Sequence, residues 1–327
     1  MSFTIIAEAT PRLNRSELAI PGSNAKFIEK APTSAADVIF FDLEDSVAVD
    51  QKEQARLNVI QALNDLDFGR KTISIRINGL DTPFMYRDVI DVVEQAGHKL
   101  DLIMIPKVGT AADIYALDML VTQIETAKNI KKRIGFELLI ETALGMQNIH
   151  AIAGASQRNE SMLLGTADFA ASTKAQTTRI GGANPNYGIL TDPAEDGSRL
   201  FHWGDMWHYA LARMVVAARA NGLRPIDGPF GDFRDEQGYL VATQRAASLG
   251  CEGKMVIHPS QIGVANTLFS PSDAEVAQAR KILKAMAAAE QAGAGAVSLD
   301  GKMLDIASIR QAQVIVQKAD RMATGKK

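Results

Sequence analysis

Two acidic residues near the middle of the chain stand where parallel strands would end. Glu141 directly follows one short apolar run, and Asp168 closely follows the next. In an α/β barrel the active site lies at the carboxyl ends of the strands, so consecutive strand ends are neighbours. Two carboxylates held together repel each other, and a hard divalent cation relieves that repulsion. The pair therefore predicts a metal site, with helix capping or ion pairing to Arg76 or Lys107 as the structural alternative.

The residue types favour Mg²⁺ at this site. Mg²⁺ usually takes one or two carboxylates and completes its shell with water and substrate oxygens. Zinc sites are built from clusters of His and Cys, and this chain has five His and one Cys with no such cluster.

A basic residue and an acidic cluster come earlier in the chain. The guanidinium of Arg76 could neutralise the carboxylates or hold a developing oxyanion, because it is always protonated. Asp42, Glu44 and Asp45 could support bound cations from outside the coordination shell, or cap the next helix. Asp305 precedes an apolar helix, so an N-cap is its default role.

Alternation along each strand predicts which side chains point into a barrel. The predicted inward sets are Phe40, Asp42 and Glu44; Ser74, Arg76 and Asn78; Glu137, Leu139 and Glu141; and Met162, Leu164, Thr166 and Asp168.

Eight apolar runs alternate with helical stretches, which predicts a closed parallel TIM (β/α)8 barrel. An open doubly wound sheet is the rival fold, but the chain has no glycine-rich dinucleotide loop. The expected strands are 17–20, 38–43, 72–77, 102–106, 134–140, 162–165, 223–226 and 254–257. The expected helices are 52–64, 85–95, 111–128, 143–152, 205–221 and 235–249, with a short link over 24–30.

Two regions depart from this alternation. Residues 173–202 are rich in Gly, Asn, Pro and Asp, and a loop of that length is usually functional or disordered. After residue 270 we expect a helix to about 292, a Gly-Ala-Gly-Ala hinge and a second helix from about 305. Its apolar positions Ile306, Ile309, Ala312, Val316 and Ala319 recur at helical spacing. The predicted domains are therefore a catalytic barrel, 1–270, and a helical extension with an active-site flap, 271–327.

Composition limits the remaining classes. The 327 residues carry a formal charge of −3 without a basic run, which argues against nucleic acid as a partner. No stretch of 18 apolar residues predicts a membrane span, and the N-terminus does not resemble a signal peptide. Cys251 is the single cysteine, so intrachain disulfides are excluded. We expect a cytoplasmic protein.

These residues resemble the citrate lyase β-subunit-like superfamily of HpcH/HpaI aldolases, and within it the malyl-CoA lyases. The resemblance extends over nearly the whole chain. The matching stretches are 21–23 (PGS), 37–47 (DVIFFDLEDSV), 74–82 (SIRINGLDT), 105–107 (IPK), 141–145 (ETALG), 165–171 (GTADFAA), 225–233 (PIDGPFGDF), 257–261 (IHPSQ) and 305–308 (DIAS).

The resemblance implies roles that spacing alone does not give. It implies Mg²⁺, or Mn²⁺, on Glu141 and Asp168, thioester and keto-acid contacts from Arg76, and Asp305 as the acid/base. Asp305 would reach the site from the C-terminal extension of a neighbouring subunit, in a homotrimer or homohexamer. The implied substrate and CoA positions are Ala19, Asn24, Lys30, Arg76, Ala167, Asp168, Ile257 and His258. Many relatives carry Arg where this chain has Asn24, so one cation for the CoA phosphates is missing.

The implied activity is reversible, Mg²⁺-dependent Claisen-type cleavage of malyl-CoA to acetyl-CoA and glyoxylate, with β-methylmalyl-CoA giving propionyl-CoA. For such a reaction we expect residues 173–202 to shape the acyl pocket. Three alternatives stay open at this point. They are a malyl-CoA thioesterase, a Schiff-base aldolase using Lys107, and a CoA-binding barrel without catalysis.

Overall fold

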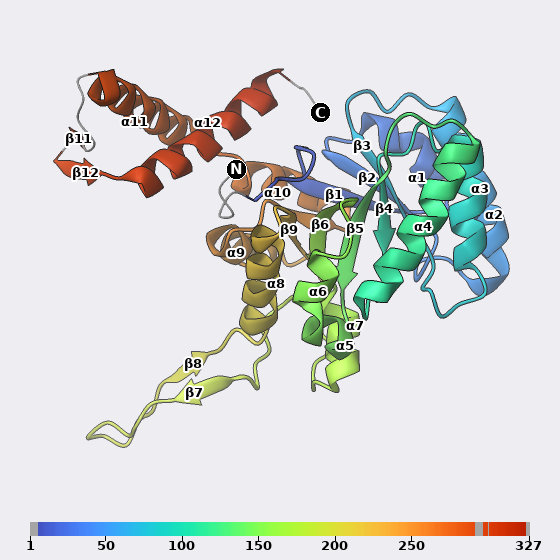
Figure 1. The fold of residues 1–327 in the computed structure, drawn as a ribbon. Helices are drawn as coiled ribbons and strands as arrows, with labels where there is room; N and C mark the ends of the chain where they lie inside the picture. Colours follow the sequence, from blue (N-terminus) through green and yellow to red (C-terminus); the bar gives the residue numbers. More distant parts are fainter. Residues whose placement is uncertain (1–5, 292–296, 300, 325–327) are drawn as a thin grey trace. The chain divides into compact units, whose positions relative to one another are not determined.

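The computed structural model describes residues 6–291, 297–299 and 301–324, and the chain divides into two compact units, Met1–Asn266 and Thr267–Lys327. The first unit is a closed barrel of eight parallel strands, in the neighbour order β1-β2-β3-β4-β5-β6-β9-β10 and back to β1 (Figure 1). The eight predicted strands are all present. Their bounds are β1 (Ser16–Pro21), β2 (Val38–Asp42), β3 (Thr72–Arg76), β4 (Leu102–Ile105), β5 (Gly135–Ile140), β6 (Asn159–Leu164), β9 (Arg224–Asp227) and β10 (Gly253–Val256).

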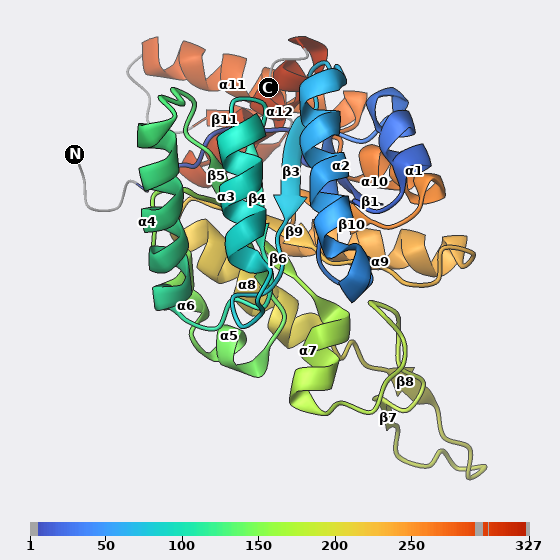
Figure 2. The ribbon, with the colours of Figure 1, turned by 90° about the vertical axis from the view of Figure 1, so that its right-hand side faces the viewer.

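Helices cover the outside of this barrel, as the row of α2, α3 and α4 in Figure 2 shows. Their bounds are α1 (Ala25–Lys30), α2 (Lys52–Asp65), α3 (Met85–Ala96), α4 (Ala111–Ala127), α5 (Ala143–Gln147), α6 (Ile149–Ala153), α7 (Thr166–Thr173), α8 (His208–Ala220), α9 (Glu236–Leu249) and α10 (Ile262–Leu268). The predicted helix 143–152 is broken at Asn148, the link 24–30 is helical, and α7 was not predicted. Short 3-10 turns lie at Ala31–Thr33, Val49–Gln51 and Pro259–Gln261.

Local capping explains where several helices begin and end. Thr110 and Asp113 form a capping box at the start of α4, and Thr142 and Asp235 accept backbone N–H bonds at the starts of α5 and α9. Helix α9 ends at Gly250, whose φ of 105° favours a residue without a side chain.

The barrel interior is layered. An apolar layer takes side chains from most of the strands: Phe40, Met104, Leu139, Leu163, Ile226 and Met255. Towards the amino ends of the strands lies a polar layer in which the Glu137 carboxylate accepts bonds from Ser74 Oγ at 2.7 Å and Ser161 Oγ at 2.9 Å. The charged residues at the carboxyl ends of the strands form the third layer.

The predicted inward face is wrong for β6. Leu163 and Ser161 point inward, whereas Met162 and Leu164 are buried outside the barrel interior. The pairing of β5 with β6 shifts register between Phe136 and Glu137. This register decides which side chains of β6 point into the barrel, and the apolar run Met162–Leu164 does not reveal it. Asp168 also leaves the strand and lies in the first turn of α7.

The region 173–202 contains a two-stranded antiparallel ribbon of β7 (Gly188–Leu190) and β8 (Phe201–Trp203), which projects from the barrel in Figures 1 and 2. All six strand residues are exposed. The expected plain loop is therefore partly ordered as strand.

The second unit consists of α11 (Asp273–Gln291), a two-stranded pair of β11 (Val297–Leu299) and β12 (Lys302–Leu304), and α12 (Ile306–Thr324). Helices α11 and α12 pack against each other. Ala312 is buried, but Ile306 is 65% exposed, so the predicted apolar face is only partly covered in the unit itself. The predicted Gly-Ala-Gly-Ala hinge lies outside the described residues. No helix in the described ranges is long and apolar enough to cross a membrane.

Candidate active site

A cavity of about 290 Å³ opens at the carboxyl ends of the barrel strands. Its floor is the apolar layer, represented by Phe40, Leu139 and Met255. The predicted site residues that line it are Ala19, Asp42, Asp45, Arg76, Glu141, Ala167, Asp168 and Ile257. The structure thus brings together residues that are separated by up to about 240 positions in sequence.

Arg76 and Asp42 form a bidentate pair at one side of the cavity. Arg76 Nε donates to Asp42 Oδ1 at 2.7 Å, and Nη2 donates to Oδ2 at 2.6 Å. Although burial opposes it, the charge and hydrogen bonds of Arg76 hold the pKa of Asp42 below its ordinary value. Asp42 therefore stays ionised and fixes the guanidinium, with Nη1 3.4 Å from Glu44 Oε2.

Glu44 and Lys107 form the next pair. Lys107 Nζ donates to Glu44 Oε1 and lies 3.5 Å from Asp45 Oδ1. Burial raises the pKa of Glu44 despite the nearby charges of Arg76 and Lys107. Burial lowers the pKa of Lys107, but the hydrogen bond and charge of Glu44 outweigh it and raise the pKa above the ordinary value. The ammonium form of Lys107 is therefore favoured.

Glu141 is buried at the exit of β5, as its position in the sequence predicts. Its Oε1 accepts the backbone N–H of Lys107 at 2.9 Å, and it forms no ion pair with any basic side chain in the described part of the chain. Lys107 has a φ of 52°, a left-handed conformation in which its N–H is presented to Glu141. Gly165 leaves the room that the carboxylate needs, because a Cβ there would lie 2.3 Å from Glu141 Oε2.

The environment of Glu141 is unfavourable for an isolated carboxylate. Burial, together with the charges of Glu44 and Asp168, raises the pKa of Glu141 to about 8. Asp168 is 37% exposed, and its Oδ1 lies 3.9 Å from Lys107 Nζ, at the outer limit of an ion pair. The alternative in which each carboxylate has its own basic partner therefore does not describe Glu141.

The donor set fits a divalent cation. Five carboxylates, from Asp42, Glu44, Asp45, Glu141 and Asp168, meet three basic side chains, from Lys52, Arg76 and Lys107, which leaves two acidic groups in excess. Within the described residues no group of three or more His, Cys, Asp or Glu could enclose a metal. A pair of carboxylates with room for water and substrate oxygens is the type of site that Mg²⁺ accepts.

A second, mainly apolar cavity of about 620 Å³ adjoins this one. It lies between β1, α1 and the start of α10, and the predicted positions Ala19, Lys30, Ile257 and His258 line it. Ala19, Pro21 and Ile257 line both cavities, so the two cavities share a wall.

Two of the predicted residues have other contacts. Asn24 caps α1 by accepting the backbone N–H of Phe27 at 3.2 Å, and it does not line the second cavity. Asp305 lies in the second unit, where its Oδ1 accepts the backbone N–H of Ser308 at 2.8 Å at the start of α12. Hydrogen bonds from Ser308 lower the pKa of Asp305. In its own unit, Asp305 has the N-cap role that its position predicts.

Several residues of the site were not predicted. Lys52 Nζ donates to the main-chain oxygens of Leu43 at 2.9 Å and Glu44 at 2.6 Å. These hydrogen bonds stabilise the turn after β2, which carries Glu44 and Asp45. Gly165 and Ile180 line the cavity, and only the type of residue 165 offered a signal in the sequence.

Comparison with known proteins agrees with this arrangement. The family model described as HpcH/HpaI aldolase/citrate lyase matches residues 15–259. This chain belongs to that family. It is 53% identical to the L-malyl-CoA/beta-methylmalyl-CoA lyase of Cereibacter sphaeroides over 323 residues, covering 99% of this chain and 100% of the relative.

Other members of the HpcH/HpaI aldolase/citrate lyase family are also similar. The malyl-CoA/beta-methylmalyl-CoA/citramalyl-CoA lyase of Chloroflexus aurantiacus is 44% identical, over 88% of this chain and 82% of its own length. The structure of CitE from Mycobacterium tuberculosis in complex with magnesium, acetoacetate and coenzyme A is 26% identical, with a TM-score of 0.69 over 93% of this chain and 97% of that chain.

Proposed function

We propose that this protein reversibly cleaves L-malyl-CoA to acetyl-CoA and glyoxylate, and β-methylmalyl-CoA to propionyl-CoA and glyoxylate. The observation that carries the proposal is an acidic cavity containing arginine directly beside a larger, mainly apolar cavity that shares three lining residues with it. The first suits a small oxo acid and the second suits the chain of a CoA thioester. The names and full-length similarity of the relatives support the same reaction.

We propose that Glu141 and Asp168 hold Mg²⁺, with Mn²⁺ as a possible substitute. The acidic excess and the raised pKa of Glu141 support this assignment. Bound there, the ion supplies Lewis-acid polarisation of a carbonyl group and a template for the oxo acid. Asp42, Glu44 and Asp45 act from outside the coordination shell, by fixing Arg76 and Lys107.

Arg76 is the proposed oxyanion stabiliser. Asp42 occupies Nε and Nη2, which leaves the N–H groups of Nη1 for the thioester oxygen when that oxygen becomes an enolate. Because Asp42 holds the guanidinium in place before substrate arrives, little reorganisation is needed during the reaction.

Asp305 is the proposed acid/base, delivered by the C-terminal extension of a neighbouring subunit in a homo-oligomer. In condensation its carboxylate accepts one proton from the methyl carbon of acetyl-CoA, and the electron pair of that C–H bond goes to the thioester oxygen beside Arg76. The enolate carbon then bonds to the carbonyl carbon of glyoxylate, the electron pair of that C=O bond passes to its oxygen, and the oxygen takes a proton from the medium. In cleavage the hydroxyl group gives up its proton to the medium, the C–C bond breaks to release glyoxylate and the enolate, and the Asp305 carboxyl returns a proton to the enolate carbon. The exposure of Asp305 and its position at a helix start leave its carboxylate accessible to a partner surface.

The CoA moiety is proposed to occupy the 620 Å³ cavity, with Lys30 as the lysine that lines it and with contacts from Ile257 and His258. Asn24 supplies no charge there, so Lys30 takes a larger share of phosphate binding than in relatives that carry an arginine. The raised pKa of Lys107 argues against a Schiff-base aldolase, because that chemistry needs a neutral amine.

A product assay tests the proposal and separates the alternatives. Purified protein is incubated with L-malyl-CoA and Mg²⁺, with and without EDTA, and glyoxylate is measured as its phenylhydrazone beside free malate and free CoA thiol. We expect glyoxylate and acetyl-CoA only when metal is present. Free malate and CoA thiol would instead identify a thioesterase, and no turnover with Mg²⁺, or with Mn²⁺ in its place, would leave only a CoA-binding barrel.

A further inference from the structure

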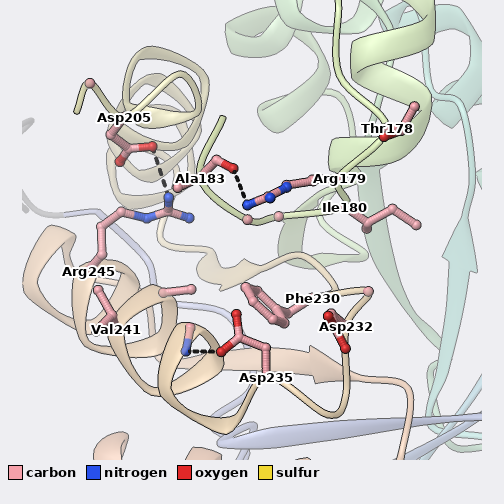
Figure 3. A pocket seen from close by; sticks show the side chains of 16 residues that line it. Thr178, Arg179, Ile180, Ala183, Asp205, Phe230, Asp232, Asp235, Val241 and Arg245 are labelled. Atoms are coloured by element: carbon pink, nitrogen blue, oxygen red, sulfur yellow. Dashed lines mark hydrogen bonds and ion pairs between the residues drawn. The ribbon is translucent and has the colours of Figure 1, made fainter. Parts of the chain in front are cut away.

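A third cavity, of about 760 Å³, lies beside the reaction cavity and is not used by the proposed reaction. It is enclosed by the segment 178–183, residues 204–205, the turn after β9 and the first half of α9. Figure 3 shows Ile180 on one side of this space, with the ion pair of Arg245 and Asp205 across from it.

Ile180 lines both this side cavity and the reaction cavity, and it is the one residue of the described chain that does so. Pro229 lines the reaction cavity and Phe230 lines the side cavity, so the wall between the two consists of Ile180 and this dipeptide. The region 173–202 was expected to shape the acyl pocket; the residue that it contributes to the reaction cavity is Ile180.

The main chain of this wall is fixed. The N–H of Gly231 donates to the Ile180 carbonyl oxygen at 2.9 Å, and a Cβ at residue 231 would lie 2.9 Å from Ile180 Cβ. Gly181 has a φ of 74°, and a Cβ there would lie 2.4 Å from the Pro229 oxygen. Since the backbone is held on both sides, the side chain of Ile180 is the part of the wall that substitution can remove.

The wall lies on the side of the reaction cavity where the proposed metal ligand Asp168 is found. A Cβ at Gly228 would lie 1.8 Å from the Leu164 oxygen, so the turn before Pro229 packs directly on the segment that leads to Asp168. The residues shared with the CoA cavity, Ala19, Pro21 and Ile257, come instead from β1 and the end of β10. An oxo acid held by Glu141 and Asp168 would therefore lie on the side of the reaction cavity to which Ile180 belongs.

We propose that Ile180 limits the size of the 2-oxo acid that the enzyme accepts, and that the side cavity is latent space for 2-oxo acids with longer alkyl chains. The inference rests on the proposed function, because it concerns the acceptor in the same reaction. Glyoxylate carries hydrogen where pyruvate carries methyl and 2-oxobutyrate carries ethyl. A pocket discriminates between substrates that differ by one methylene by about 10- to 200-fold.

The test compares wild type with Ile180→Ala, Ile180→Val and Val241→Ala. Val241 lines the side cavity but not the reaction cavity, so its truncation is the matched control. Each protein condenses acetyl-CoA with glyoxylate, pyruvate, 2-oxobutyrate and 2-oxopentanoate in the presence of Mg²⁺, and the hydroxyacyl-CoA products are quantified by mass spectrometry. Binding of each oxo acid to the Mg²⁺-loaded protein is measured in parallel by calorimetry.

We expect kcat/KM for 2-oxobutyrate relative to glyoxylate to rise at least ~10-fold in Ile180→Ala and by a smaller factor in Ile180→Val. The ratio should stay at its wild-type value in Val241→Ala. An unchanged ratio in an Ile180→Ala protein that still uses glyoxylate overturns the inference. The inference is also overturned if Ile180→Ala changes kcat/KM only when the acyl-CoA is varied among acetyl-, propionyl- and butyryl-CoA, because Ile180 would then face the thioester.

Two further outcomes are also decisive. If Ile180→Ala loses all activity, the same ratio in Ile180→Val decides the question in either direction. If wild type forms no product from acetyl-CoA and glyoxylate, the proposed function fails. The calorimetric ratio of 2-oxobutyrate to glyoxylate affinity still decides whether Ile180 sets the size limit, rising in Ile180→Ala if it does and staying constant if it does not.

Discussion

Replacing Arg76 by alanine removes a charge that has both a structural and a catalytic partner. The guanidinium binds the Asp42 carboxylate through two hydrogen bonds, and the side chains of Arg76 and Asp42 are only 13% and 2% exposed. The same guanidinium is the proposed partner of the enolate oxygen. The substitution should therefore lower both turnover and stability, by amounts that can be separated experimentally.

The catalytic loss follows from the oxyanion role. Removing one preorganised donor to an oxyanion costs about 2.7–4 kcal/mol, so turnover of malyl-CoA should fall ~100- to 1,000-fold. The stability loss follows from Asp42, because breaking a buried ion pair on one side costs about 3–5 kcal/mol. At about 2 °C per kcal/mol for a chain of this size, the Tm should fall by about 6 °C or more at pH 8.

The stability loss should depend on pH. Arg76 holds the folded-state pKa of Asp42 below its ordinary value, so the pair stabilises the protein above the unfolded pKa of about 4. That contribution is lost as the pH falls through the lower folded-state pKa. In Arg76→Ala, Asp42 can take up a proton in acid, and the Tm deficit should therefore be larger at pH 8 than at pH 4.

A second substitution separates the two effects. In Arg76→Ala/Asp42→Asn the unpaired carboxylate is gone, so the Tm at pH 8 should recover by several degrees while turnover stays low. Arg87→Ala is the matched control, because the Arg87 side chain is 55% exposed and its contacts with Asp91 and Tyr86 stay on its own helix, away from the site. Calorimetry gives the Tm, and glyoxylate release gives turnover. If turnover of Arg76→Ala stayed within ~10-fold of wild type, or returned with Asp42→Asn, Arg76 would be a structural partner of Asp42 only.

Three more predictions concern other carboxylates. Glu141→Gln should abolish the rise in Tm that MgCl2 gives wild type, whereas Glu94→Gln, at an exposed ion pair, should keep it. Asp305→Asn should leave α12 intact, since Asn caps as well as Asp, yet lower turnover at least ~100-fold; full turnover would remove Asp305 from the mechanism. The Tm of Glu17→Gln minus the Tm of wild type should increase as the pH rises from 5 to 8. Burial and the charge of Glu137 raise the pKa of Glu17, so wild type loses stability as its unfolded state deprotonates. A constant difference from pH 5 to pH 8 would refute this linkage.

The sequence predicts the barrel well because its strands are short apolar runs that are clearly separated by helical stretches. It also predicts the inward faces of β2, β3 and β5, where polar residues such as Asp42, Arg76 and Glu141 alternate with apolar ones. It fails at β6, since Met162, Leu163 and Leu164 are all apolar and only pairing with β5 fixes which of them points inward.

The parts of the site that the sequence does not reveal depend on backbone conformation and on distant contacts. Nothing in the residue type of Lys107 indicates a positive φ, yet that conformation brings its N–H to Glu141. Ile180 is one apolar residue in a polar segment, and its place in the wall depends on contacts with Pro229 and Gly231. His258 was predicted only through the resemblance, and it lines the same cavity as Lys30 because β1 and β10 are neighbours in the closed barrel.

The apolar layer inside the barrel has a consequence for how this protein can change over time. This layer lies between the Glu17–Glu137 pair and the reaction cavity, and it consists of Phe40, Met104, Leu139, Leu163, Ile226 and Met255. Burial raises the pKa of Glu137 most. The side chains that also influence this pKa include Ser74, Ser161, Arg224 and Glu160, and none of these four lines that cavity. Mutations that adapt the fold to acidic or alkaline surroundings can thus accumulate below this apolar layer without changing a residue that lines the reaction cavity.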